Sequence, residues 1–61
     1  LTDLQSKILG SLVRGLTNSE IATEFSLSLI STKRQLASIF TALGAANRAE
    51  AIGIALKKHL L

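Results

Sequence analysis

Residue types that carry covalent, metal and redox chemistry are missing or nearly missing from this 61-residue chain. There is no cysteine, so disulfides, thiolate metal sites and cysteine nucleophiles are excluded together. The only histidine, His59, stands near the end of the sequence, and a single histidine does not make a metal site. No glycine-rich phosphate loop is present. We therefore expect no enzymatic activity, no metal and no cofactor.

Long apolar runs are absent as well. No run approaches the roughly 18 residues of a membrane-spanning helix, and no charged-then-apolar secretion signal opens the chain. Together with the lack of cysteine, this favours a cytoplasmic protein without a membrane partner. The sequence begins at Leu1 rather than at Met, so we expect it to be a piece of a longer protein.

Acidic residues are few, and their placement is uneven. The formal net charge is +3, and all four acids lie outside residues 25–49, which carry Lys33, Arg34 and Arg48. Such a region attracts phosphate. A solvated basic face is an equally good interpretation, and charge alone does not decide between the two.

The composition predicts a packed, all-α domain. The chain is 48% hydrophobic, which is too apolar for a disordered tail. Proline and β-branched alternation are absent, and alanine and leucine dominate. The apolar periodicity predicts four helices at about residues 3–14, 18–25, 29–43 and 48–58.

Capping residues mark the ends of these helices. A polar N-cap precedes each helix, at Thr2, Thr17, Ser28 and Asn47. A glutamine or glutamate three residues later predicts a reciprocal capping box at three of them, through Gln5, Glu20 and Glu50. Gly15 and Gly44 are placed for left-handed stops.

The third segment has two distinct sides when it is projected as a helix. The side expected to face the core carries Leu29, Thr32, Leu36, Ile39, Phe40 and Leu43. On this side the Thr32 hydroxyl can hydrogen-bond to the Ser28 carbonyl. The adjoining side carries Ile30, Lys33, Arg34, Ala37 and Thr41.

The short connection between the second and third segments predicts a helix-turn-helix. A major groove about 12 Å wide admits a helix, where arginine can read guanine and an apolar side chain can meet a thymine methyl. The N-terminus around Thr17, Asn18 and Ser19 offers N–H groups to a phosphate. A helical bundle with a polar surface explains the composition and periodicity equally well.

The motifs carry a stronger indication. In order along the chain stand Leu1-Thr2, GLTNSEIA at 15–22, Leu27-Ser28, Lys33, Leu36, Ile39-Phe40, Leu43-Gly44 and NRAEA at 47–51. Over the whole chain, this pattern resembles the LuxR/FixJ-type (GerE-like) C-terminal DNA-binding domain of bacterial transcriptional regulators. The resemblance implies that residues 1–61 form one such four-helix domain, taken from the C-terminal end of a longer cytoplasmic regulator.

The resemblance also implies roles for individual residues. The third helix is expected to enter the major groove of double-stranded DNA, with the domain dimerising through the fourth helix. The base-reading candidates are Ile30, Lys33, Arg34 and Ala37. The phosphate-contact candidates are Thr17, Asn18, Ser19, Ser28 and Thr41. The candidates for a homodimer interface are Ala49, Gly53, Leu56 and Lys57. Gly53 costs about 1 kcal/mol relative to alanine within a helix, so a close packing partner is expected there.

Further partners follow from the family. An upstream receiver domain would make the parent protein a two-component response regulator, the option we favour, and a ligand-sensing domain is the alternative. RNA polymerase is a further candidate partner.

Several residues depart from the family pattern. Gln5 and Lys7 stand where acids are common, Ser19 and Ala42 where lysine is common, and Gln35 where histidine is frequent. Because fewer cations remain, we expect weak DNA binding by the single domain. The alternative function is a dimerisation or protein-interaction module with weak or no DNA binding.

Overall fold

The computed structural model describes residues 1–58, and within them it contains four helices and no strand. The helices are α1 (Asp3–Val13), α2 (Asn18–Glu24), α3 (Leu29–Leu43) and α4 (Arg48–Lys57). The predicted all-α fold is confirmed, and the bounds of α3 match the prediction. The other three helices end one residue earlier than predicted, because Arg14, Phe25 and Lys58 are their C-caps.

Local hydrogen bonds start α1 and α2 as the sequence indicated. The Thr2 hydroxyl accepts from the Gln5 N–H, and the Gln5 side chain accepts from the Thr2 N–H, both at 3.1 Å. Thr17 and Glu20 form the same reciprocal pair.

The start of α4 differs from the predicted capping box. Asn47 caps the helix by accepting from the Glu50 N–H at 2.9 Å. The Glu50 carboxylate, however, accepts from the Ala46 N–H at 2.9 Å instead of from Asn47. Asn47 is more extended (φ −160°) than Thr2 and Thr17 (φ −75° and −74°), so its N–H group points in a different direction. We attribute the replacement of the Asn47 N–H by the Ala46 N–H as donor to this difference.

Three helices end in the same Schellman motif, in which two N–H groups beyond the helix bond back to its last carbonyls. After α1 and α3 the left-handed residue is Gly15 (φ +89°) and Gly44 (φ +69°). After α2 it is Ser26 (φ +55°), and the Leu27 N–H reaches the Ala22 carbonyl at 2.8 Å. The turn into α3 therefore has a defined geometry although no glycine stands there.

The core lies between α1 and the other three helices. Its buried apolar residues come from all four helices: Ile8, Leu9, Leu12, Ile21, Leu36, Ile39, Ala51 and Ala55. The Thr32 side chain is also fully buried, and its hydroxyl donates to the Ser28 carbonyl at 2.9 Å as predicted.

Some predicted core positions of α3 are wrong or only partly right. Leu29 is 45% exposed, while Phe40 and Leu43 are half-buried against the core. Leu29 and Phe40 lie roughly 50–70° from the centre of the buried side in a helical projection. They therefore sit at the margin, where the neighbouring helices cover them incompletely.

The small residues of α4 divide between two sides. Ala51 and Ala55 are fully buried, whereas Ala49 and Gly53 are exposed. A Cβ added at Gly53 would meet nothing within 4 Å. The expected close packing partner of Gly53 is therefore absent from the described part of this chain.

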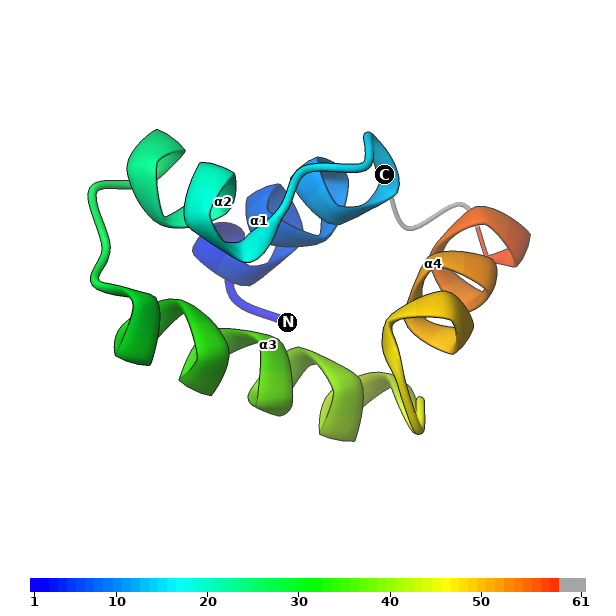
Figure 1. Cartoon of the computed structure of the whole chain (residues 1–61). Helices are drawn as coiled ribbons and strands as arrows, with labels where there is room; N and C mark the ends of the chain where they lie inside the picture. The colour runs from blue at the N-terminus through cyan, green and yellow to red at the C-terminus, as the bar shows by residue number, and fades with distance from the viewer. Residues whose placement is uncertain (59–61) are drawn as a thin grey trace.

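The arrangement leaves one long side of α3 uncovered. In Figure 1, α3 runs along the bottom, with α1 and α2 above it and α4 beyond its C-terminal end. Within residues 1–58, no single helix is long and apolar enough to span a membrane, and only the α3–α4 pair, bent by 54°, meets those criteria together.

Candidate nucleic-acid interface

The predicted base-reading residues lie together on the uncovered side of α3. Ile30, Lys33, Arg34 and Ala37 are all exposed, and Ile30 has 65% of its surface accessible. Their spacing of three or four residues makes them a continuous strip along the helix. We call these four residues the outer strip of α3. Thr41 continues it toward the C-terminal end of the helix and is also exposed.

Most of the predicted phosphate-contact residues already have a role in the fold. The Thr17 and Ser28 hydroxyl oxygens accept from the Glu20 and Ser31 N–H groups at 3.1 and 3.0 Å. A hydroxyl that accepts such a bond keeps its own O–H to donate to a phosphate. Ser19 is exposed on the first turn of α2.

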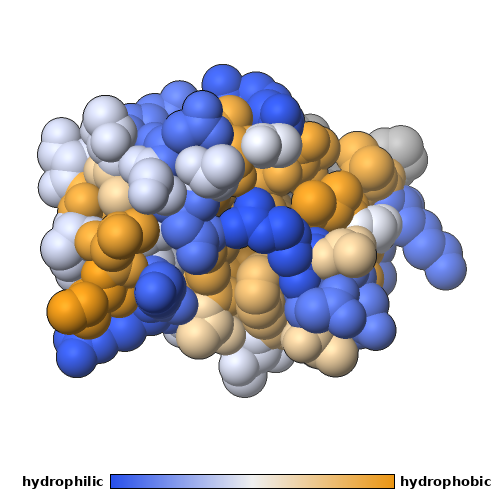
Figure 2. All heavy atoms as spheres, in the orientation of Figure 1, coloured by the Kyte–Doolittle hydropathy of each residue, from blue (hydrophilic) through white to orange (hydrophobic). Residues whose placement is uncertain are grey.

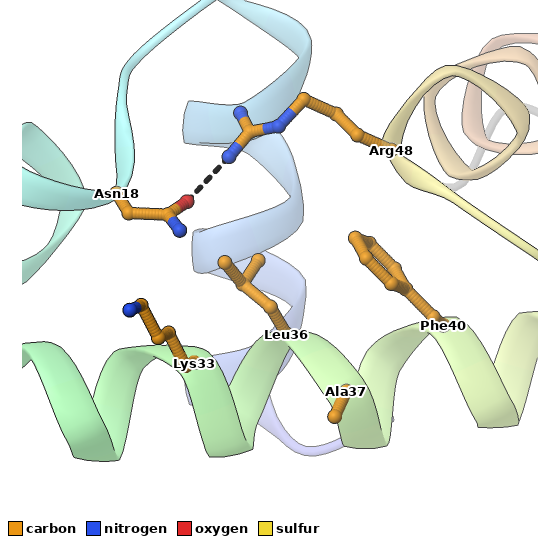
Figure 3. Close-up of a pocket in the computed structure, with 6 residues that line it drawn as sticks. All are labelled: Asn18, Lys33, Leu36, Ala37, Phe40 and Arg48. Atoms are coloured by element: carbon orange, nitrogen blue, oxygen red, sulfur yellow. Dashed lines mark hydrogen bonds between the residues drawn. The ribbon is translucent and has the colours of Figure 1, made fainter.

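A hollow of about 270 Å³ separates the start of α2, the middle of α3 and the start of α4. Figure 3 shows Leu36 and Phe40 rising from α3 into it, with Lys33 beside them and Asn18 and Arg48 bonded across it. The floor is therefore apolar, while the rim carries the polar groups.

Arg48 is held inside the fold and is not part of the exposed basic group. Its guanidinium donates to the Leu16 carbonyl at 3.0 Å and to the Asn18 side-chain oxygen. These bonds join the start of α4 to the start of α2. Charge alone groups Arg48 with Lys33 and Arg34, whereas its position inside the NRAEA motif was the signal of a separate role.

A polar cluster between α1 and α2 was not predicted. Ser11 is fully buried and donates to the Glu24 carboxylate, and Arg14 donates to the same carboxylate at 3.1 Å. The Ser11 hydrogen bond lowers the pKa of Glu24 below its ordinary value of 4.5; desolvation opposes this shift, and Arg14 adds to it. The signal in the sequence was a serine within the apolar stripe of the first helix, since buried polar groups find partners.

Two of the departures from the family pattern contact each other. The Gln5 side chain of α1 donates to the Gln35 side-chain oxygen of α3 at 3.2 Å. The pair is neutral and links α3 to α1, and Gln35 is not part of the outer strip.

The predicted dimer residues form a second exposed strip, on α4. Ala49, Gly53, Leu56 and Lys57 are all exposed, and Leu56 is 56% accessible. We call them the outer strip of α4. His59 lies outside the described residues. Among the described residues, no group of three histidine, cysteine or acidic side chains is placed to hold a metal ion.

Comparisons with known proteins identify similar chains. The family model for GerE, bacterial regulatory proteins of the luxR family, matches residues 1–55. The transcriptional regulatory protein YdfI of Bacillus subtilis (strain 168) is 36% identical over 61 residues, which are 100% of this chain and 29% of YdfI. The crystal structure of the response regulator ChrA, from a heme-sensing two-component system, superposes with a TM-score of 0.95 at 33% identity, covering 100% of this chain and 30% of ChrA. The chain thus spans less than a third of either relative.

Proposed function

This chain belongs to the luxR family of bacterial regulatory proteins, and we propose that it binds double-stranded DNA as the helix-turn-helix domain of a transcriptional regulator. The observation that carries the proposal is the outer strip of α3. It is exposed along its length and carries two cations, Lys33 and Arg34. A helix presented in this way can enter a major groove.

The two cations of the strip have different roles in this proposal. Arg34 has a planar guanidinium that can donate to guanine O6 and N7 together, so it reads a base. Lys33 stands beside the hollow and acts as a point charge on a phosphate. The Thr17, Ser19 and Ser28 hydroxyls and the Asn18 amide supply further donors to the phosphates, as does Thr41 at the far end of the strip.

We propose that the domain pairs through the outer strip of α4. Gly53 and Ala49 leave room for a second backbone, and the exposed Leu56 supplies apolar surface for the contact. Two copies would place two α3 helices on half-sites about one helical turn of DNA apart. Pairing compensates for the small number of cations in a single copy.

The parent protein is proposed to be a cytoplasmic response regulator with an upstream receiver domain. The similarity to ChrA, which is a response regulator, supports this proposal over a ligand-sensing domain. The parent protein would also contact RNA polymerase when it regulates transcription.

The test is salt-dependent binding to duplex DNA. Lys33→Ala should weaken binding to all sequences and lower the slope of log K against log salt by about 1. Arg34→Ala should cost about 1–3 kcal/mol at one base position and less on random DNA. Lys7→Ala removes an exposed cation from α1, away from the outer strip of α3, and should leave the slope unchanged.

A clear negative result is available. If the folded wild-type chain binds no duplex at low salt, the DNA-binding proposal fails and the protein-interaction module becomes the better interpretation. If Lys33→Ala and Lys7→Ala change the slope equally, Lys33 is not at the interface.

A further inference from the structure

The first turn of α3 exposes two adjacent aliphatic side chains. Leu29 is 45% and Ile30 65% exposed, and these are among the most exposed large apolar residues of the described chain. Figure 2 shows apolar surface over this end of α3, next to hydrophilic side chains. Leaving such groups in water forgoes the free energy that their burial would contribute, so each of them is a candidate for contact with a partner.

Viewed down the helix axis, Ile30 lies between Lys33 and Arg34 of the outer strip of α3, whereas Leu29 lies outside the strip. In a helical projection Ile30 lies roughly 60° from Lys33 on one side and roughly 40° from Arg34 on the other. Ala37 is within roughly 20° of it, two turns further along. Leu29 is roughly 100° away, at the margin of the core.

We propose that Ile30 contacts the 5-methyl group of a thymine, so that one T·A pair of each half-site is selected by an apolar contact. This inference rests on the proposed DNA binding and names a feature of the sequence that is bound. The thymine methyl is the apolar group that a base pair presents in the major groove, so it is the partner there that an aliphatic side chain can recognise.

The surroundings of Ile30 favour DNA over an apolar protein surface. Cations flank it on both sides, and residues 25–49 contain no acid that would neutralise them. A partner at this position must therefore be negatively charged around a small apolar centre, which is the pattern of a thymine between two phosphate backbones. Ala37 is small, so it does not hold the helix away from the base edges.

The experiment replaces thymine by uracil, which pairs identically with adenine and lacks only the methyl group. Random duplexes are enriched on the wild-type chain at low salt, and each thymine of the best duplex is then replaced singly. At one position in each half-site, uracil should weaken wild-type binding about fourfold. Losing the burial of one methylene-sized group accounts for a factor of this size, because about 1.4 kcal/mol of binding free energy changes the affinity tenfold.

The variants assign this loss to one side chain. Ile30→Ala should bind the thymine duplex more weakly and show no further loss with uracil at that position. Leu29→Ala removes a neighbouring side chain with the same number of atoms and should keep the fourfold difference. Ile30→Val, which lacks one methyl group, should give an intermediate ratio. Both sites, Leu29 and Ile30, are exposed, so circular dichroism should show the parent fold for all three variants.

Three results would overturn the inference. One is a uracil penalty that is the same in Ile30→Ala as in the wild type. Another is the absence of any uracil-sensitive position in a duplex that the wild type binds, and the third is a penalty lost in Leu29→Ala instead. A wild-type chain that binds no duplex at all would refute the proposed function, and this is seen before any uracil is introduced.

Discussion

Replacing Arg48 by alanine should destabilise the domain while leaving the residues of the outer strip of α3 unchanged. The guanidinium is half-buried and donates to the Leu16 carbonyl and to the Asn18 side chain, so it joins two helix N-termini that are distant in sequence. Alanine would remove both bonds and leave the partly buried Leu16 carbonyl without this donor. The substitution therefore removes tertiary hydrogen bonds. We do not assign Arg48 a contact with DNA, although it is a cation that lines the same hollow as Lys33.

The expected cost follows from the bonds that are lost. Hydrogen bonds to charged groups contribute about 1.5–3 kcal/mol, and we take this range for the two together because the side chain is only half-buried. A chain of this length has a free energy of unfolding of roughly 3–9 kcal/mol. The loss is a large fraction of that stability and should lower the melting temperature by roughly 6–24 °C.

Urea unfolding followed by circular dichroism measures this cost. Arg48→Lys should recover only part of it, because an ammonium group lacks the planar fork that spans both acceptors. Arg34→Ala is the matched control: Arg34 is exposed on the outer strip of α3, and its loss should change stability by less than about 0.5 kcal/mol. If Arg48→Ala unfolds within that margin of the wild type, the bridge does not support the fold and the reasoning is refuted.

Three other perturbations test separate features of the fold. Ser26→Gly should raise the free energy of unfolding by about 0.5–1 kcal/mol, because relief of the left-handed strain exceeds the added unfolded-state entropy; a neutral or destabilising result in urea would contradict this. Gly53→Ala should stabilise the monomer by about 1 kcal/mol, since the new Cβ meets nothing, and a lowered melting temperature would contradict the open space around it. The lowered pKa of Glu24 means that its carboxylate stabilises the fold above its ordinary pKa of 4.5, and that this contribution is lost as the pH falls through the lower folded value. Glu24→Gln should therefore lose less stability than the wild type on acidification below that pH, and parallel acid-unfolding curves would contradict the assignment.

The elements of the fold could be predicted because their determinants are local. The N-caps Thr2, Thr17, Ser28 and Asn47 act on N–H groups three residues away, so sequence spacing alone locates each helix start. The same holds for the Thr32 hydroxyl, which reaches one helical turn back. The exposed strip of α3 was also predictable, since it follows from helical periodicity.

Residues at the margin of the core were harder to assign. Periodicity predicts which side of a helix is apolar, but it does not say how far neighbouring helices extend over the edge of that side. Leu29 was expected in the core and is exposed, whereas Phe40 is half-buried at the same margin. Gly53 was expected to have a close partner, yet the side of α4 that packs on the core is the one with Ala51 and Ala55.

The sequence by itself determined the four helices, the family and the candidate reading strip, because each depends on residues a few positions apart or on motifs in a set order. Only the tertiary structure decided which polar groups meet. Arg48 finds Asn18, and Gln5 finds Gln35, across 30 residues of sequence in both cases. Such pairs exist because helix packing brings distant side chains within hydrogen-bonding distance. That packing also turns one cation, Arg48, inward and leaves another, Arg34, exposed on the surface proposed to meet DNA.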